Sequence, residues 1–367
     1  MGKYKLINNV LGWVTFAISS IVYLMTMEPT ASFWDCGEFI SSAYKLEVGH
    51  PPGAPFFMLT ANLFTQFASD PSQVAVMVNS MSALFSGLTI LFLFWSITHL
   101  ARRILVTEGE EISNSQLITI MGSGLVGALA YTFSDTFWFS AVEGEVYAYS
   151  SLFTAVVFWL ILKWEAVADK PHADRWMVLI AYLMGLSIGV HLLNLLCIPA
   201  IVLVYYYKKY PNPTLKGTFV ALFISFAIIA VMMYGVVQGL VEVCGWFELL
   251  FVDGMGMPYN SGVFAYVVVL LGVIAWAIYE TMTSNPNKVR MNIAFILSVT
   301  LIGIPFIGSG YVIGILLIAA LTAYLFLSKR TSIEVMNTIL VSLLVIVVGY
   351  SSYALILVRS SAETPMD

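Results

Sequence analysis

Charged side chains are scarce in this sequence, and their scarcity excludes a water-soluble globular fold. Of the 367 residues, 10% are charged and 60% are hydrophobic, and the mean hydropathy is +0.90. A soluble domain carries about 25% charged residues. The composition therefore predicts an all-α, polytopic membrane protein.

Three further absences narrow the function. The net charge is −5 and no basic stripe is present, which argues against binding to nucleic acid. The three cysteines, Cys36, Cys197 and Cys244, have no metal-site spacing and no even count, so we expect neither a disulfide framework nor a metal cluster. No P-loop or Rossmann-type glycine pattern occurs, so a nucleotide-binding fold is not expected.

Long apolar runs are what the sequence contains instead. A bilayer core takes roughly 20 apolar residues per helix. Polar breaks then delimit about 11 predicted transmembrane helices, at residues 7–27, 74–100, 115–134, 146–163, 176–191, 193–207, 216–241, 262–281, 291–307, 311–328 and 334–357. The first follows Lys3 and Lys5 without a small-residue cleavage site, so we expect an uncleaved span. The shorter apolar segment 54–68 is interpreted as a helix in or near the outer interface.

The basic residues predict the orientation, because Lys and Arg collect in cytoplasmic loops. A cytoplasmic N-terminus places 14 of the 16 Lys and Arg residues inside, and the other two are Lys45 and Arg359. Two long loops, 28–73 and 242–261, then lie outside with most of the acidic residues. The loop 242–261 is aromatic and glycine-rich, so it is either a lid over a cavity or part of an interfacial aromatic belt.

The first outer loop contains two acids, Asp35 and Glu38, three residues apart. If residues 34–47 form an amphipathic helix, both acids share its polar arc, opposite an apolar face. Ser32 and Asp35 have the spacing of a capping box, which is the simpler explanation of Asp35 alone. Two acids on one face also repel each other, and such pairs can act as a base and a partner of unequal pKa. These residues leave catalysis and plain solvation both open.

His50 begins a His-Pro-Pro-Gly turn that follows this predicted helix. Each proline fixes its own φ and restricts the residue before it, so the turn is stiff. One interpretation is that His50 merely ends the helix. The other is that the rigid turn aims an imidazole at an anionic phosphate.

Polar residues near the outer ends of other spans are further candidates. Glu143 and Glu145 stand at the start of a span, where acids suit the helix dipole. Because they are two apart on a helix, at most one is expected to face a cavity, and we favour Glu145, which Tyr147 follows. His191 and Asn79 lie at span ends as well. Each is either functional or an ordinary packing residue.

The whole pattern resembles the GT-C membrane glycosyltransferases, which use sugars linked to a polyprenyl phosphate. The shared features are an inside N-terminus, many spans and an acid early in a long first outer loop. The run DCGEFISSAYKLEVGHPPGAPFF is similar to the Asp-x-Gly-Glu and His-Pro-Pro-Gly signature of the DUF2723 family. The segment VEGEVYAYSSLF resembles that family's second outer loop. Beyond the first half of the chain, only the hydropathy matches.

The resemblance implies an enzyme of the bacterial inner membrane, because the family is common in Bacteroidetes and includes protein O-mannosyltransferases. It implies inverting transfer of a sugar, mannose above all, from a polyprenyl-phosphate donor to Ser or Thr hydroxyls of exported proteins on the periplasmic side. Asp35 would be the general base, Glu38 its partner, and His50 and His191 contacts of the lipid phosphate. The candidate substrate-binding residues are His50, Asn79, Glu143, Glu145, Tyr147 and His191.

No cofactor or metal is implied by the resemblance. The outer acids could hold a divalent cation, but no tight cluster of ligands marks such a site. Family members often carry a large outer soluble domain after the spans. We therefore expect residues 1–367 to be a GT-C-like transmembrane domain without it.

Three other functions stay open. A glycosyltransferase that acts on a lipid or glycan acceptor would use the same residues. A transporter of lipid-linked sugars would need polar groups at mid-membrane on broken helices, whereas nearly all acids here lie at the predicted outer rim. A scaffold without activity would tolerate loss of Asp35.

Overall fold

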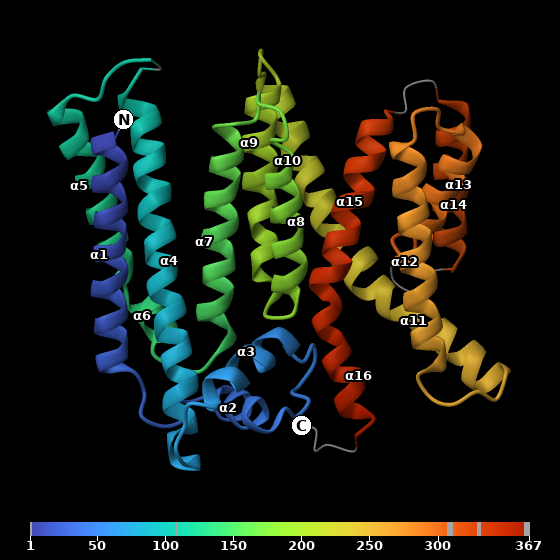
Figure 1. Ribbon diagram of the computed structural model, residues 1–367, viewed down its shortest axis with the longest axis horizontal. Helices are drawn as coiled ribbons and strands as arrows, with labels where there is room; N and C mark the ends of the chain where they lie inside the picture. Colours follow the sequence, from blue (N-terminus) through green and yellow to red (C-terminus); the bar gives the residue numbers. More distant parts are fainter. Residues whose placement is uncertain (1, 108, 307–310, 329–331, 363–367) are drawn as a thin grey trace. The chain divides into compact units, whose positions relative to one another are not determined.

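The structure is a computed structural model that describes residues 2–107, 109–306, 311–328 and 332–362 (Figure 1). Within these ranges the chain is helical, with no strand, as the composition predicted. By its internal contacts the chain divides into two compact units. The first unit comprises Met1–Lys208 and Ile346–Asp367, and the second comprises Lys209–Val345.

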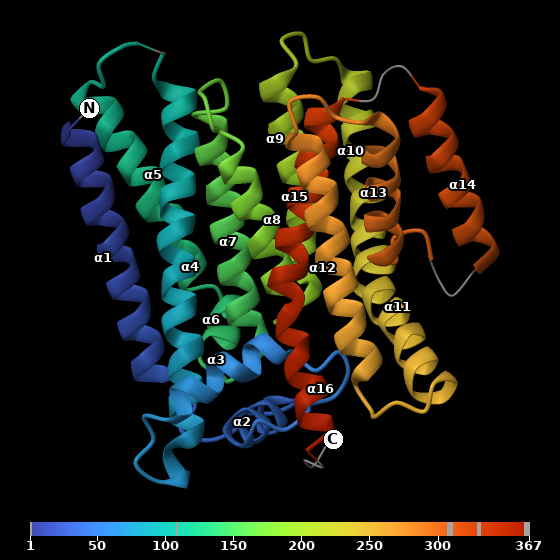
Figure 2. The ribbon, with the colours of Figure 1, turned by 45° about the vertical axis from the view of Figure 1, so that its right-hand side comes forward.

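The first unit is built around α4, which packs against α1, α5 and α7. Figures 1 and 2 show these helices running in a common direction, with α2 and α3 lying across one end. The elements are α1 (Gly2–Thr26), α2 (Cys36–Lys45), α3 (Pro55–Thr65), η1 (Pro71–Gln73), α4 (Val74–Leu105), α5 (Asn114–Thr132), α6 (Asp135–Ala141), α7 (Val146–Glu165), α8 (Arg175–Ile188), η2 (Leu192–Cys197), α9 (Ile198–Lys209), the end of α15 (Ile333–Tyr350), η6 (Ser351–Tyr353) and α16 (Ala354–Ser360).

Small residues allow these helices to approach closely. A Cβ added at Gly124 of α5 would lie 2.7 Å from the ring of Phe94 on α4. Phe94 is itself fully buried, together with Ile90 one turn earlier on α4. A larger side chain at Gly124 would therefore force α5 away from α4.

The second unit contains α10 (Leu215–Ala230), η3 (Val231–Val237), α11 (Gln238–Leu249), η4 (Leu250–Gly254), α12 (Ser261–Met282), α13 (Lys288–Leu301), α14 (Tyr311–Leu327) and most of α15. Its core gathers around Phe295, Leu325 and Leu340. Gly239 and Gly303 pack backbone against backbone, because a Cβ at Gly239 would lie 2.7 Å from the carbonyl carbon of Gly303.

The predicted number of about 11 transmembrane helices is not confirmed. Seven helices among the described residues are long and apolar enough to cross a membrane, or eight if α5 and α6, bent by 68°, form one span. Three more apolar helices, at Pro55–Thr65, Arg175–Ile188 and Tyr311–Leu327, are shorter. A helix of 14 residues such as α8 is about 21 Å long, which is less than the roughly 30 Å of a hydrocarbon core.

The predicted outer loop at 242–261 is largely helical. Helical turns continue from Leu215 to Gly254, and two π-helical segments lie within this stretch. A single Gly245 does not interrupt the helix, since one glycine costs a helix only about 1 kcal/mol. Non-helical structure is confined to the residues between Gly254 and Ser261, where Gly256 has a positive φ of 68° and Pro258 follows.

Candidate active site

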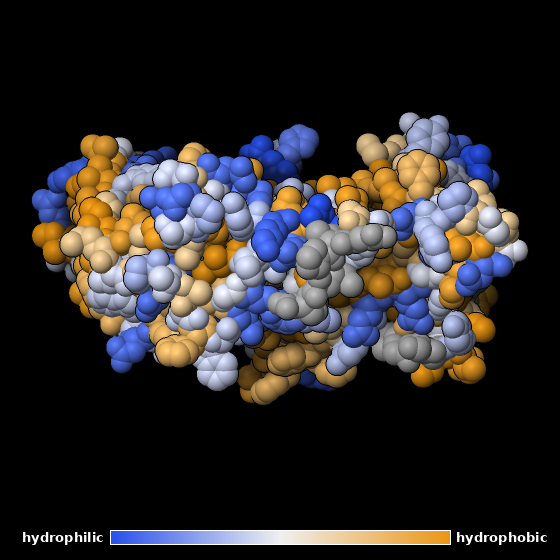
Figure 3. All heavy atoms as spheres, turned by 90° about the horizontal axis from the view of Figure 1, so that it is seen from below, coloured by the Kyte–Doolittle hydropathy of each residue, from blue (hydrophilic) through white to orange (hydrophobic). Residues whose placement is uncertain are grey.

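The acids predicted from the sequence meet at the end of the first unit that carries α2. We call Asp35, Glu38, Glu143 and Glu145 the acidic cluster. The first two lie on or beside α2, and the other two lie in the bend at residues 142–145 that precedes α7. Figure 3, which looks onto the end of the molecule that bears α2, shows hydrophilic side chains interspersed with hydrophobic ones there.

Three hydrogen-bonded connections hold α2 and α3 in place. The side-chain amide of Asn62 on α3 donates to the carbonyls of Ala43 and Tyr44 at the C-terminal end of α2, at 2.8 and 3.1 Å. The N–H of Phe56 donates to the carbonyl of Gly189 after α8, at 2.7 Å. Arg359 of α16 donates to the carbonyl of Leu46 at 2.6 Å. Segments distant in sequence thus fix the positions of α2 and α3, and with them the positions of Asp35 and Glu38.

Asp35 is an exposed N-cap residue whose side chain forms no cap hydrogen bond. The capping-box explanation is wrong because the helix begins at Cys36 and the Ser32 hydroxyl bonds Glu143 instead. The backbone carbonyl of Asp35 accepts the first helical hydrogen bond, from Phe39 at 2.9 Å. Its carboxylate is therefore not occupied in capping the helix.

Glu38 and His50 form an ion pair. Glu38 accepts from His50 Nδ1 at 2.8 and 3.0 Å and from the His50 backbone N–H at 2.6 Å. The bond to Glu38 raises the pKa of His50, and burial only partly opposes this. Gly49 permits the contact, because a Cβ there would lie 2.9 Å from Glu38 Oε1. The N–H of Gly53, with φ of 87°, donates to the His50 carbonyl at 2.8 Å and closes the predicted turn.

Glu143 is buried, with 4% of its surface exposed. Its carboxylate is hydrogen-bonded to the side chains of Ser32 and Cys36. Burial is the main cause that raises the pKa of Glu143. Burial also raises the pKa of the Cys36 thiol to about 12, with the charges of Glu143 and Glu145 adding to the effect. The Cys36 thiol therefore stays protonated and neutral beside the Glu143 carboxylate.

Glu145 is the most unusual acid of the site. It is 5% exposed, and its Oε2 atom is buried without a hydrogen-bond partner among the described residues. Burial raises the pKa of Glu145 to about 7, and the charges of Glu143 and Asp35 push it the same way. Helical spacing predicted that at most one of Glu143 and Glu145 faces inward. Residues 142–145 form a bend, where that spacing does not apply, and both carboxylates are buried.

The other predicted residues fall into two places. Asn79 of α4 is fully buried, and its amide donates to the carbonyls of Glu28 and Thr30 at 2.6 and 3.1 Å, so it fixes the chain that leads to α2. Tyr147 and His191 form a pair with ring centroids 5.5 Å apart. His191 Nδ1 accepts from the Leu193 N–H at 3.1 Å.

An apolar cavity of about 630 Å³ includes Tyr147 in its wall. It lies between α4, α5, α7 and η2, and its polar lining consists of hydroxyl groups rather than charges. Sequence reasoning missed this feature. On α7 the lining residues recur three or four positions apart, which is the spacing of one helix face; they are Tyr147, Ser150, Ser151, Thr154, Ala155 and Phe158. Across the described ranges, no group of three or more His, Cys, Asp or Glu residues could hold a metal ion.

A helical membrane protein with buried acids at the ends of its spans is the class that these observations define. Residues 35–214, which contain the acidic cluster, His50, Asn79, Tyr147 and His191, match the family described as the protein O-mannosyl-transferase TMEM260 N-terminal domain. The chain is similar to protein O-mannosyl-transferase tmem260 of Dictyostelium discoideum, with 27% identity over 185 residues, and to TMEM260 of Mus musculus, with 28% identity over 174 residues.

These alignments cover 49% and 47% of this chain but only 20% and 22% of the two relatives. The chain thus corresponds to about a fifth of the length of the curated relatives that it matches. No solved structure matches it. The comparisons support a relationship to the TMEM260-like O-mannosyltransferases, which is the family that the sequence resemblance indicated.

Proposed function

We propose that this chain is the membrane part of a GT-C-type protein O-mannosyltransferase of the bacterial inner membrane. It transfers mannose from a polyprenyl-phosphate donor to Ser or Thr hydroxyls of exported proteins, with inversion. Its N-terminus is cytoplasmic and its acidic cluster faces the periplasm. The observation that carries the proposal is that the match to an O-mannosyl-transferase family includes every member of the acidic cluster.

The chemistry requires a base on the acceptor side. Asp35 accepts the proton of the acceptor hydroxyl, whose oxygen forms a bond to the anomeric carbon of the donor. The bond between that carbon and the phosphate oxygen breaks, and polyprenyl phosphate leaves. The exposed position and uncapped carboxylate of Asp35 support this role, because a base must reach its substrate. Glu38, already paired with His50, orients the site around it.

The leaving phosphate needs hydrogen-bond donors. His50, whose pKa is raised by Glu38, retains its positive charge to a higher pH and suits an anionic phosphate. His191 accepts at Nδ1, so its neutral form carries the proton on Nε2, from which it can donate. The apolar cavity beside Tyr147 suits the polyprenyl tail. We propose no cofactor, because the lipid-linked sugar is itself a substrate; a divalent cation at the outer acids is possible but not indicated.

The test is sugar transfer by the purified chain in lipid vesicles, with radiolabelled mannosyl-phosphoryl-polyprenol and periplasmic protein extract. Wild type is expected to label protein, and Asp35→Asn to lower the rate by roughly 10²-fold or more, because a general base contributes on this order. The matched control is Asp70→Asn, an exposed acid bonded to Ser72 near α4, which should leave the rate unchanged.

Other outcomes would change the proposal. Equal labelling by wild type and Asp35→Asn would remove Asp35 from the mechanism. Label in the lipid fraction rather than in protein would replace the protein acceptor with a lipid or glycan. Absence of label with the wild-type chain would contradict transfer from this donor, and a flux assay in the same vesicles would then test transport.

A further inference from the structure

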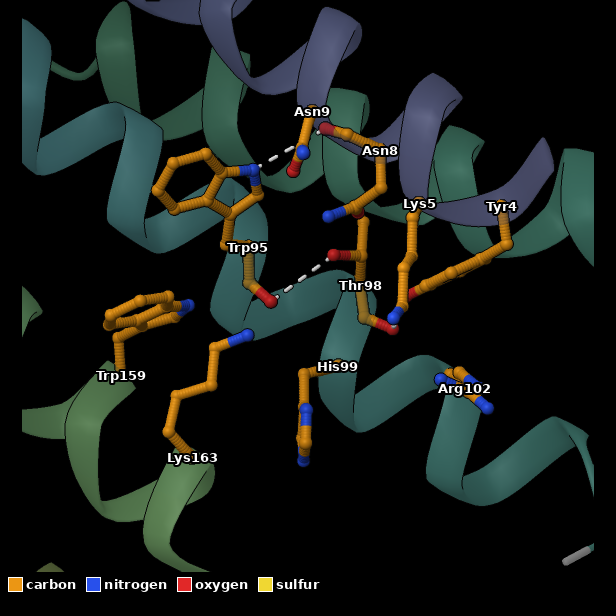
Figure 4. A pocket seen from close by; sticks show the side chains of 10 residues that line it. All are labelled: Tyr4, Lys5, Asn8, Asn9, Trp95, Thr98, His99, Arg102, Trp159 and Lys163. Carbon is orange, nitrogen blue, oxygen red and sulfur yellow. Dashed lines mark hydrogen bonds between the residues drawn. The ribbon is translucent and has the colours of Figure 1, made fainter. Parts of the chain in front are cut away.

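A second cavity, of about 320 Å³, lies beside the start of α1 and the ends of α4 and α7. Figure 4 shows the side chains that line it. Its wall comes from α1, α4 and α7. The side chains that carry or can carry positive charge there are Lys5, His99, Arg102 and Lys163. They come from three separate helices, so basic side chains from different helices meet at this cavity instead of forming the charged face of one helix.

These cations have few counter-ions. No described residue forms an ion pair with Lys5, Arg102 or Lys163 at salt-bridge distance. The carboxylate of Glu165, at the end of α7, is bound by Arg103 and lies 3.8 Å from His99 Nε2, too far for a hydrogen bond. Like charges therefore face each other across the cavity. An anion placed among them would relieve this repulsion.

Aromatic rings and unsatisfied polar atoms complete the cavity. Lys163 Nζ lies 4.7 Å from the centroid of the Trp159 ring, and the centroids of Trp95 and Trp159 are 5.7 Å apart. His99 Nε2 and Asn8 Oδ1 are buried without a hydrogen-bond partner among the described residues. A ligand with several oxygen atoms and a hydroxyl group could supply partners to both.

The position along α7 indicates where the ligand resides. Lys163 follows Glu145 by 18 residues, which is about 27 Å along a helix and close to the thickness of roughly 30 Å of a hydrocarbon core. If the acidic cluster lies at one membrane boundary, this cavity lies at the other. Lipid headgroups occupy that level, and tryptophan is enriched there.

We propose that the cavity lined by Lys5, His99, Arg102 and Lys163 is a binding site for a phosphate group, with an anionic phospholipid headgroup as its source. Lys and Arg recognise phosphate through charge-assisted hydrogen bonds. Clusters of basic residues beside spans recognise anionic lipids in the same way. This site is separate from the acidic cluster and does not depend on the proposed transferase activity.

The test measures lipid binding to the full chain in detergent by native mass spectrometry. The probes are phosphatidylglycerol, phosphatidylcholine with the same acyl chains, and inorganic phosphate as a competitor. Wild type should bind one phosphatidylglycerol in preference to phosphatidylcholine. The double variant Lys5→Gln with Lys163→Gln should bind it roughly 30-fold more weakly, because two cations near the headgroup are lost.

The matched control removes the same charge from the same end of the unit. Lys3→Gln with Lys170→Gln changes two exposed lysines outside the cavity and should keep wild-type affinity, as should Lys5→Arg with Lys163→Arg. Displacement by inorganic phosphate at similar concentration would support the phosphate site but assign it to a soluble source. Equal binding of both lipids by wild type, or an equal loss in the control variant, would overturn the proposal.

Discussion

The two ends of α7 have opposite chemistry. At the start of the helix, Glu143 and Glu145 are 4% and 5% exposed and lie next to further acids. At its end, Lys163 is half-buried and borders an open cavity with Lys5, which is exposed. At the start of α7 the acidic side chains are buried inside the protein, whereas at its end the basic side chains line a cavity. The comparison suggests two different uses of charge.

Buried acids are costly, because a carboxylate loses its hydration; at Glu145 the charge of His50 offsets this loss only in part. Glu145 has an unpaired buried oxygen as well. A fold selected only for stability would replace it with an apolar residue or pair it. At the other end, Lys5 is exposed and Arg102 and Lys163 are only half-buried, so the cost of their charges is smaller, and a bound anion would relieve their repulsion.

The largest expected effect is that of a change at Glu145 on the rate of mannose transfer. Glu145→Gln keeps the size of the side chain and removes its charge, and we expect the rate of mannose transfer to fall by roughly 10²-fold if the buried carboxylate acts on substrate protons. The measurement is the vesicle assay described above. Asp135→Asn, an exposed acid in the first turn of α6, is the control and should transfer at the wild-type rate. A fully active Glu145→Gln enzyme would mean that the buried acid has no part in the reaction.

The next largest effect is the change of the free energy of unfolding with pH. The pKa of Glu145 is raised in the folded protein from 4.5 to about 7. Between these values the folded chain keeps a proton that the unfolded chain has lost, so the free energy of unfolding falls as pH rises through this window. The full loss attributable to Glu145 is roughly 3 kcal/mol. Unfolding in detergent at pH 4.5 to 7.5 would measure it.

Two variants separate the groups that contribute to this trend. Glu145→Gln should flatten most of the slope, and the remainder reflects Glu143, whose pKa burial also raises. His50 has a raised pKa too, so its ion pair with Glu38 stabilises the fold fully below pH 6.5 and less as pH rises beyond it. His50→Gln should therefore lower the free energy of unfolding most below pH 6.5, and it should remove only the part of the slope that lies above pH 6.5. An unchanged slope in Glu145→Gln would contradict the assignment of the trend to this acid.

Local rules predicted much of the site. The α2 helix, the turn after His50 and the grouping of Asp35 with Glu38 follow from residue spacing and from two prolines. The contacts that complete the site could not be predicted, because they join distant segments. The hydrogen bonds from Ser32 and Cys36 to Glu143 are of this kind. So is the hydrogen bond from the Asn79 amide to the carbonyl of Glu28, in the chain before α2. The predicted number of spans is not confirmed, because hydropathy alone does not say how long a helix will be.

The smallest effect tests whether the Glu38–His50 pair is set by its surroundings. Gly49→Ala introduces a Cβ at 2.9 Å from Glu38 Oε1 and 3.1 Å from Met58 Cε, so the carboxylate must shift from His50. We expect a loss of about 1 kcal/mol in unfolding free energy, in the range of a weakened hydrogen bond to a charged group that is partly screened by solvent. The rate of transfer should fall only a few-fold, because Asp35 is untouched.

Gly37→Ala is the matched control, because it makes the same chemical change at the residue just before Glu38, where an added Cβ has room. Its added Cβ would meet only Ala31, at 4.0 Å, within ordinary contact distance. Alanine also favours a helix over glycine, so stability should stay the same or rise slightly. If both alanine variants behaved alike, Gly49 would not be what allows Glu38 to reach His50. If Gly49→Ala alone lost stability and its pH dependence above pH 6.5, the packing around Gly49 would be what holds the ion pair together at the acidic end of the helices.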